Sequence, residues 1–110
     1  MVAPSFTCEQ TGANQVVLTW PAVPNVEAYR LTVYVGDNAS VLRYFDLDYT
    51  KYADIEIPAQ ADGMAYTFTY GRPYSVEEGV KIRFELCGIR HAANGATQKS
   101  RASTQVIVLH

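Results

Sequence analysis

The sequence predicts an all-β protein, a two-sheet antiparallel β-sandwich of seven or eight strands. Three observations support this fold class. Short segments rich in Val, Ile, Thr, Tyr and Phe recur along the chain, and their residues alternate between apolar and polar. Gly, Pro, Asn or Asp separates these segments, and no long stretch has the period of a helix. The 110 residues provide for one hydrophobic core, so we expect a single domain over residues 1–110.

The first two strands are expected over residues 5–10 and 15–20, with the turn Thr-Gly-Ala-Asn between them. Pro21 and Pro24 end the second strand because proline cannot donate a hydrogen bond to a sheet ladder. Side chains alternate across a strand, so one face of each strand points inward. The predicted inward residues of these two strands are Phe6, Cys8, Val16, Leu18 and Trp20.

A third strand is expected over residues 28–35, with Tyr29 on its apolar face. The proline-bounded connection that follows Trp20 does not suit a tight hairpin, so we place the second and third strands on facing sheets. Trp20 and Tyr29 should then meet across the core.

The rest of the chain predicts further strands over residues 41–46, 53–57, 65–70, 80–90 and 103–109. The alternation is clearest over residues 80–90, which should therefore form a central strand. Asn94-Gly95 is typical of a hairpin tip. The predicted core of the whole sandwich comprises Leu18, Trp20, Tyr29, Leu31, Val33, Ile82, Phe84 and Leu86.

Charge and hydropathy exclude several classes of partner. The formal net charge is −2, and the nine Lys and Arg residues are scattered, so we expect no nucleic-acid partner. Apolar runs such as residues 106–109 are far shorter than a membrane helix, and residues 1–4 lack the features of a signal peptide. We therefore expect no membrane insertion. Met1 directly precedes the first expected strand, as it would if a start codon had been added to an excised module.

Two segments resemble the fibronectin type III family. Leu18-Thr19-Trp20, followed by Pro21, a short linker and Tyr29 to Tyr34, is similar to that family's second and third strands. Residues 76–86 are similar to the approach into its sixth strand. Ile82 and Glu78 stand where the family has the tyrosine of its tyrosine corner and a turn proline. The segment 45–73 is longer than the family's link between middle strands, which predicts an extra strand or an enlarged loop.

The resemblance implies a non-catalytic structural or protein-interaction module of a larger extracellular or cell-surface protein. Its partners would be neighbouring domains or another protein. One alternative is an accessory carbohydrate-binding module, because flat aromatic rings with a hydroxyl group suit glycans. The tyrosines in or near the long segment that would serve it are Tyr44, Tyr49, Tyr52 and Tyr74. Another alternative is a small independent protein that self-associates through the edges of its sandwich.

The two cysteines allow two interpretations. Cys8 should face inward, whereas Cys87 should share a face with Arg83 and Glu85. Two separate thiols are therefore favoured, and a disulfide would need a bulge that shifts one of the strands. A bridge between these positions would also differ from the immunoglobulin pattern, which joins the second and sixth strands.

The densest acidic stretch allows a calcium site as an alternative, because hard cations take carboxylate oxygens. It consists of Asp46, Asp48, Asp54 and Glu56, whose spacing does not fit an EF-hand loop. The simpler interpretation is the solvated face of a strand. We expect no metal and no cofactor.

Catalytic chemistry is not indicated. His91 and His110 are the only histidines, and neither can be placed beside a nucleophile. Glu77-Glu78 precedes a glycine in a turn, where solvated charge is expected. We therefore expect no enzyme activity and no catalytic residue.

Two further surface features remain open. Asn38-Ala39-Ser40 has the N-glycosylation pattern and lies in an expected turn, which matters only in a eukaryotic secretory pathway. The last strand and the Asn94-Gly95 hairpin could pair with a neighbouring domain or a partner strand.

Overall fold

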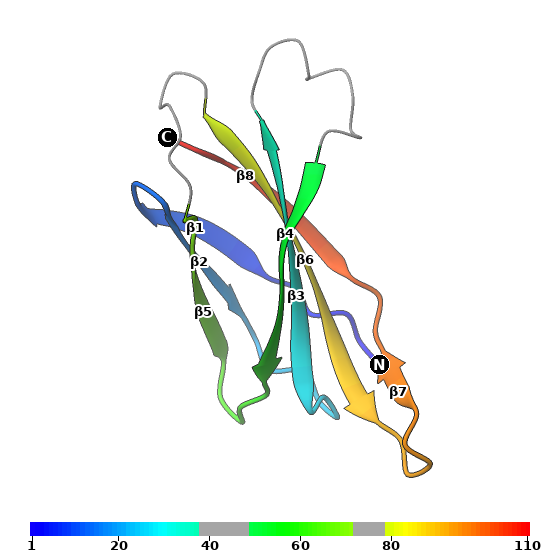
Figure 1. Ribbon diagram of the computed structural model, residues 1–110. Helices are drawn as coiled ribbons and strands as arrows, with labels where there is room; N and C mark the ends of the chain where they lie inside the picture. Colours follow the sequence, from blue (N-terminus) through cyan, green and yellow to red (C-terminus); the bar gives the residue numbers. More distant parts are fainter. Residues whose placement is uncertain (38–48, 72–78) are drawn as a thin grey trace.

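Two antiparallel sheets pack face to face, which confirms the predicted β-sandwich (Figure 1). The computed structural model describes residues 1–37, 49–71 and 79–110. The three-stranded sheet has the order β1-β2-β5, formed by β1 (Thr7–Gly12), β2 (Gln15–Trp20) and β5 (Met64–Thr69). The five-stranded sheet contains β3 (Ala28–Asp37), β4 (Tyr49–Pro58), β6 (Val80–His91), β7 (Thr97–Lys99) and β8 (Ser103–Leu109). Its order is β4-β3-β6, with β7 and β8 both paired to β6.

The predicted strands that fall on described residues are found at or close to their predicted positions. The strands β2 and β8 have the predicted bounds, and β6 is central, with β3 on one side and β7 and β8 on the other. The first strand begins at Thr7 rather than at residue 5, because its ladder to β2 starts with the pair Thr7 and Thr19. The predicted strand over residues 41–46 lies outside the described residues. The short strand β7 was not predicted, since its three residues are all polar and exposed.

The core lies between the sheets, and all eight predicted core residues are in it. Trp20 on β2 and Tyr29 on β3 meet edge to face, with ring centroids 5.3 Å apart and an interplanar angle of 74°. The hydroxyl of Tyr29 accepts a 2.9 Å hydrogen bond from the backbone N–H of Val23, which lies in the proline-bounded connection. The pair therefore joins the two sheets, as the sequence predicted, and the Tyr29 hydroxyl also ties the loop between them to the core.

A β-bulge on β4 directs one aromatic side chain across an edge of the sandwich, from the five-stranded sheet to the three-stranded sheet. The β3–β4 register runs from Val33 opposite Ala53 to Tyr34 opposite Lys51, which leaves Tyr52 as the extra residue. The bulge turns the Tyr52 ring toward β5, where its centroid lies 5.6 Å from that of Phe68. The Tyr52 hydroxyl also accepts a 2.9 Å hydrogen bond from the N–H of Gly71.

Glutamine side chains link the sheets on the opposite side, between β1 and β8. The amide of Gln10 donates to the carbonyl of His110 and accepts from its N–H, both at 3.0 Å. Gln105 on β8 donates to the carbonyl of Phe6 at 3.3 Å. Hydrogen-bonding groups that an edge strand would leave to solvent are thus partly used within the molecule.

The hairpin between β6 and β7 turns at Asn94-Gly95, as predicted. Gly95 has a φ of 86°, a conformation that glycine adopts without steric cost. The side chain of Asn94 accepts a hydrogen bond from the N–H of Ala96 at 3.0 Å.

Candidate functional site

The most distinctive surface of the described residues is on the outer face of the five-stranded sheet. On β6 the buried residues alternate with Lys81, Arg83 and Glu85, which therefore point away from the core. The register places Tyr34 of β3 and Val106 of β8 on the two sides of Arg83. We define the outer-face cluster as Tyr34, Tyr49, Lys81, Arg83, Val106 and Val108.

The guanidinium of Arg83 is held by two aromatic rings. Its central carbon lies 4.5 Å from the ring centroid of Tyr34 and 4.6 Å from that of Tyr49. Such contacts are attractive because the face of an aromatic ring carries partial negative charge. Gly36 lies opposite Tyr49 and leaves room for its ring, since a Cβ there would be 3.1 Å from two ring carbons. The glycine thus lets the Tyr49 ring lie close to the sheet.

The charge of Arg83 is only partly compensated. Its Nε is buried without a hydrogen-bond partner, although it lies 3.4 Å from Oε2 of Glu85. About a third of each side chain is exposed, at 29% for Arg83 and 30% for Glu85. Because Nε itself is buried, the exposure falls on other parts of the Arg83 side chain. A guanidinium carries five N–H donors, so this pair leaves most of them unused.

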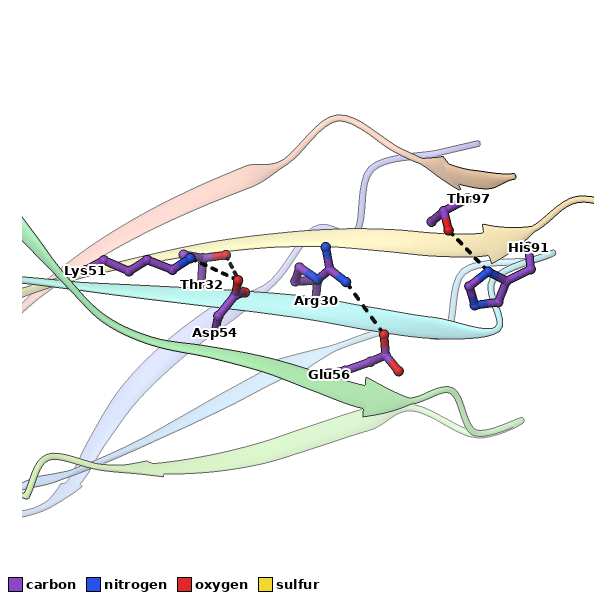
Figure 2. Close-up of polar contacts among 7 residues, drawn as sticks. All are labelled: Arg30, Thr32, Lys51, Asp54, Glu56, His91 and Thr97. Carbon is purple, nitrogen blue, oxygen red and sulfur yellow. Dashed lines mark hydrogen bonds and ion pairs between the residues drawn. The ribbon is translucent and has the colours of Figure 1, made fainter. Parts of the chain in front are cut away.

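Salt bridges and hydrogen bonds neutralise the adjoining part of the same face (Figure 2). Arg30 lies 3.8 Å from Glu56, and Lys51 donates to Oδ2 of Asp54 at 3.0 Å. Thr32 donates to the other Asp54 oxygen at 3.1 Å. Lys51 and Asp54 share the outer face because the bulge lies between them. By contrast, Lys81 forms no salt bridge with the described residues.

These contacts bear on the calcium alternative. Asp54 and Glu56 lie on the solvated face of β4, as the simpler interpretation predicted, and each contacts a cationic side chain. Asp46 and Asp48 lie outside the described residues. Among residues 1–37, 49–71 and 79–110, no group of three His, Cys, Asp or Glu side chains could hold a metal ion.

Asp54 predicts a small loss of stability at low pH. The hydrogen bond from Lys51 holds the pKa of the Asp54 carboxyl below its usual value, and Thr32 adds to the effect. A depressed folded-state pKa stabilises the protein above the unfolded-state pKa of about 4, and this contribution is lost as the pH falls through the folded-state value. We expect Asp54→Asn to lower the urea midpoint at pH 7 but much less at pH 2.5. Because the carboxyl is largely exposed, the effect should be small.

The matched control for this measurement is Glu9→Gln, which removes an exposed carboxylate from β1. Its urea midpoint should follow the wild-type pH dependence. An Asp54→Asn variant with the same pH dependence as the wild type would contradict a stabilising role of the Asp54 contacts.

Both cysteines are free thiols, so the favoured interpretation is confirmed. Cys8 on β1 is partly buried against the core, whereas Cys87 lies opposite Arg30, on the other sheet. Burial raises the pKa of the Cys8 thiol. A raised pKa lowers the fraction of reactive thiolate.

Alkylation without reductant tests the state of the thiols. In denaturant, mass spectrometry should find two modified cysteines per chain. In the native protein, Cys8 should react more slowly than in denaturant, because it is buried and its pKa is raised. Cys8→Ser and Cys87→Ser variants assign the modified peptides, and a chain that resists alkylation in denaturant would contradict free thiols.

The two histidines lie at opposite ends of β6. Nδ1 of His91 is 3.3 Å from the hydroxyl of Thr97 in the exposed hairpin (Figure 2). His110 follows Leu109, which pairs with Val80 at the start of β6. The structure therefore does not bring the histidines together. Glu77 and Glu78 lie outside the described residues.

The predicted tyrosine surface is found only in part. Tyr52 is partly exposed, but the bulge turns its ring against Phe68 and Tyr70, so it does not offer a free flat face. Tyr49 belongs to the outer-face cluster. Tyr44, Tyr74 and the Asn38-Ala39-Ser40 pattern lie outside the described residues.

Sequence reasoning did not single out Tyr34 and Arg83 as site residues. Their outward position was visible in the alternation of their strands. Their contact depends on the register that places Tyr34 opposite Arg83, and on the Tyr49 ring over Gly36. Neither the register nor the close approach can be read from alternation alone.

Comparison with other proteins gives no family. The part of the chain that the structure describes contains no helix that could cross a membrane. The chain matches no protein-family model, and a search of curated proteins likewise found no match.

Proposed function

We propose that this protein is a non-catalytic β-sandwich module of the fibronectin type III kind that binds another protein through the outer-face cluster. The observation that supports this proposal most directly is the contact of the Arg83 guanidinium with the rings of Tyr34 and Tyr49. Tyr and Arg dominate the residues that contribute most to protein interfaces. A side chain that is already held by its neighbours loses less entropy on binding. Val106, which is 50% exposed, adds apolar area on the same face.

The strand arrangement supports the immunoglobulin-like part of this proposal. In constant-type immunoglobulin domains, the first, second and fifth strands share one sheet, and the third, sixth and last share the other. The strands β1, β2 and β5 here form one sheet, while β3, β6 and β8 belong to the other. The difference is β4, which pairs with β3 instead of joining the first sheet.

The positions of the chain ends support the role of a module within a larger extracellular or cell-surface protein. Met1 lies near Gly88, toward one end of β6, whereas Leu109 pairs with Val80 at the other end. Gly88 follows Val80 by eight positions along β6, which corresponds to roughly 25–30 Å of strand. Neighbouring domains could therefore be attached at opposite ends of the sandwich (Figure 1).

The described tyrosines favour protein binding over glycan binding. A glycan platform needs exposed, flat aromatic faces. Tyr29 and Tyr70 are buried, and the described remainder are only partly exposed. The rings of Tyr34 and Tyr49 already contact the guanidinium of Arg83. Retention of the protein on any member of a polysaccharide panel would reverse this preference.

Site-specific photo-cross-linking tests the binding role. A photoreactive phenylalanine analogue would replace Val106 on the outer face of the five-stranded sheet, or Thr67 on the outer face of the other sheet. In extracts of the source, the probe at position 106 should give a discrete protein adduct, and the probe at position 67 should not. The same pattern of adducts from both positions, or none from either, would contradict binding by the outer-face cluster.

The mass of the native product tests the module role. An antibody against this domain should detect a protein much larger than 12.2 kDa in the source. A product near that mass would contradict the role of a module in a larger chain and would favour a small independent protein.

A further inference from the structure

We infer that the partner presents a carboxylate beside an apolar side chain, and that Arg83 and Lys81 bind the carboxylate while Val106 contacts the apolar group. This inference rests on the proposed function, since it names the chemistry of the protein that the outer-face cluster would bind.

Three stripes of different chemistry run side by side on this half of the sheet. Tyr34 and Tyr49 form an aromatic stripe on β3 and β4. Lys81 and Arg83 form a cationic stripe on β6, two residues apart and therefore on one face. Val106 and Val108 form an aliphatic stripe on β8, directly opposite the two cations. A ligand that satisfies all three must combine negative charge with apolar area.

The charge distribution favours an acidic ligand although the chain as a whole is acidic. The formal net charge is −2, yet the cluster contains two cations, and Glu85 beside them compensates the charge of Arg83 only in part. The neighbouring cations Arg30 and Lys51 are already in salt bridges with Glu56 and Asp54. Lys81 has no such partner among the described residues. Complementary charge steers association and fixes the orientation of the partner.

The geometry of Arg83 favours a carboxylate in particular. The planar guanidinium matches a carboxylate through two parallel hydrogen bonds, and such charge-assisted bonds are stronger than neutral ones. The rings of Tyr34 and Tyr49 hold the guanidinium in place. Glu85 lies 3.4 Å from Nε, and a single carboxylate cannot use all five N–H donors of a guanidinium, so donors remain for a ligand. The site is thus aligned before the partner arrives.

Arrays of 12-residue peptides provide the test. One set alternates Asp or Glu with Leu or Val, and the matched set carries Asn or Gln in place of each acid. We expect the acidic set to bind at least about tenfold more tightly, with binding that weakens as salt is raised. Equal binding of both sets, or no binding of either, would overturn the inference.

Variants assign the binding to these residues. Arg83→Gln should lower the affinity for the acidic peptides at least about tenfold, and Arg83→Lys by a smaller factor, because it keeps the charge but not the planar fork. Lys81→Gln should also weaken binding, although this substitution leaves Tyr34, Tyr49 and Arg83 unchanged. Lys99→Gln, which removes an exposed cation from β7, should leave the affinity within about twofold. An Arg83→Gln variant that binds as the wild type does would overturn the inference.

Glu85→Gln should raise the affinity for the acidic peptides, which a loss of folding cannot do. It removes the carboxylate that lies 3.4 Å from Nε of Arg83, so the acidic peptides should bind more tightly. Unchanged or weaker binding would contradict the competition between Glu85 and the ligand. If the peptides fail while the probe at position 106 still cross-links a protein, the partner chemistry is wrong and the binding role stands. Failure of both removes the proposed function as well.

Discussion

A Trp20→Ala variant should lose about 3–5 kcal/mol of unfolding free energy. Trp20 is 3% exposed, and its ring meets Tyr29 of the facing sheet at a centroid distance of 5.3 Å. Truncation removes the transfer free energy of the indole and leaves a cavity between sheets that cannot close fully. Domains of this size are stable by only about 5–15 kcal/mol. Urea denaturation followed by far-UV circular dichroism measures the loss, since the variant has no tryptophan fluorescence.

Two variants separate packing from other effects of the substitution. Trp20→Phe keeps an aromatic ring, and it breaks no hydrogen bond because the indole Nε1 has no partner among the described residues. It should cost roughly 1–2 kcal/mol, less than the alanine variant. Val106→Ala shortens an exposed side chain and should stay within about 0.5 kcal/mol of the wild type. A Trp20→Ala loss below about 1 kcal/mol would mean that Trp20 does not fill the core.

The sequence was sufficient for the fold class and for most of the core. The predicted bounds of β2 and β8 were correct, and in β2 every second side chain is buried, as alternation requires. The prolines after Trp20 placed β2 and β3 on different sheets. The predicted start of a strand was wrong where pairing with a neighbouring strand determines it. The first strand begins at Thr7 because its ladder starts there, opposite Thr19.

The site was much less predictable, because it depends on contacts between strands. Alternation showed that Tyr34 and Arg83 face outward, but not that they are cross-strand neighbours. The bulge at Tyr52 could not be predicted either, and it turns this partly exposed side chain toward β5. Neither feature has a local sequence pattern. Both arise from the pairing of strands that are distant in the chain.

Gly88→Ala should destabilise the protein by about 1–3 kcal/mol, through overpacking. Gly88 is buried on β6, opposite Tyr29. A Cβ at this position would lie 2.8 Å from Cγ2 of Val26, which is closer than two carbon atoms can pack. Valine is stiff about χ1, so the methyl group cannot simply rotate away.

The backbone on both sides of this contact is also fixed. Next to Val26, the N–H of Glu27 donates to the carbonyl of Ile89 at 2.9 Å, and the carbonyl of Glu27 accepts from Ala59 at 3.0 Å. The N–H of Gly88 donates to the hydroxyl of Ser100 at 2.9 Å, and its carbonyl accepts from the N–H of Ser100 at the same distance. A shift of either segment that relieves the overlap would strain one of these bonds.

A double-mutant cycle with Val26→Ala tests this explanation by chemical denaturation. Val26→Ala removes the methyl groups that the new Cβ would meet, so Gly88→Ala should cost less in that background than in the wild type. Gly63→Ala is the matched control, because a Cβ there would contact only the carbonyl oxygen of Trp20 at 3.9 Å. It should change stability by less than about 0.5 kcal/mol. Additive losses in the cycle would contradict a steric cause, because residues that are not in contact usually contribute independently.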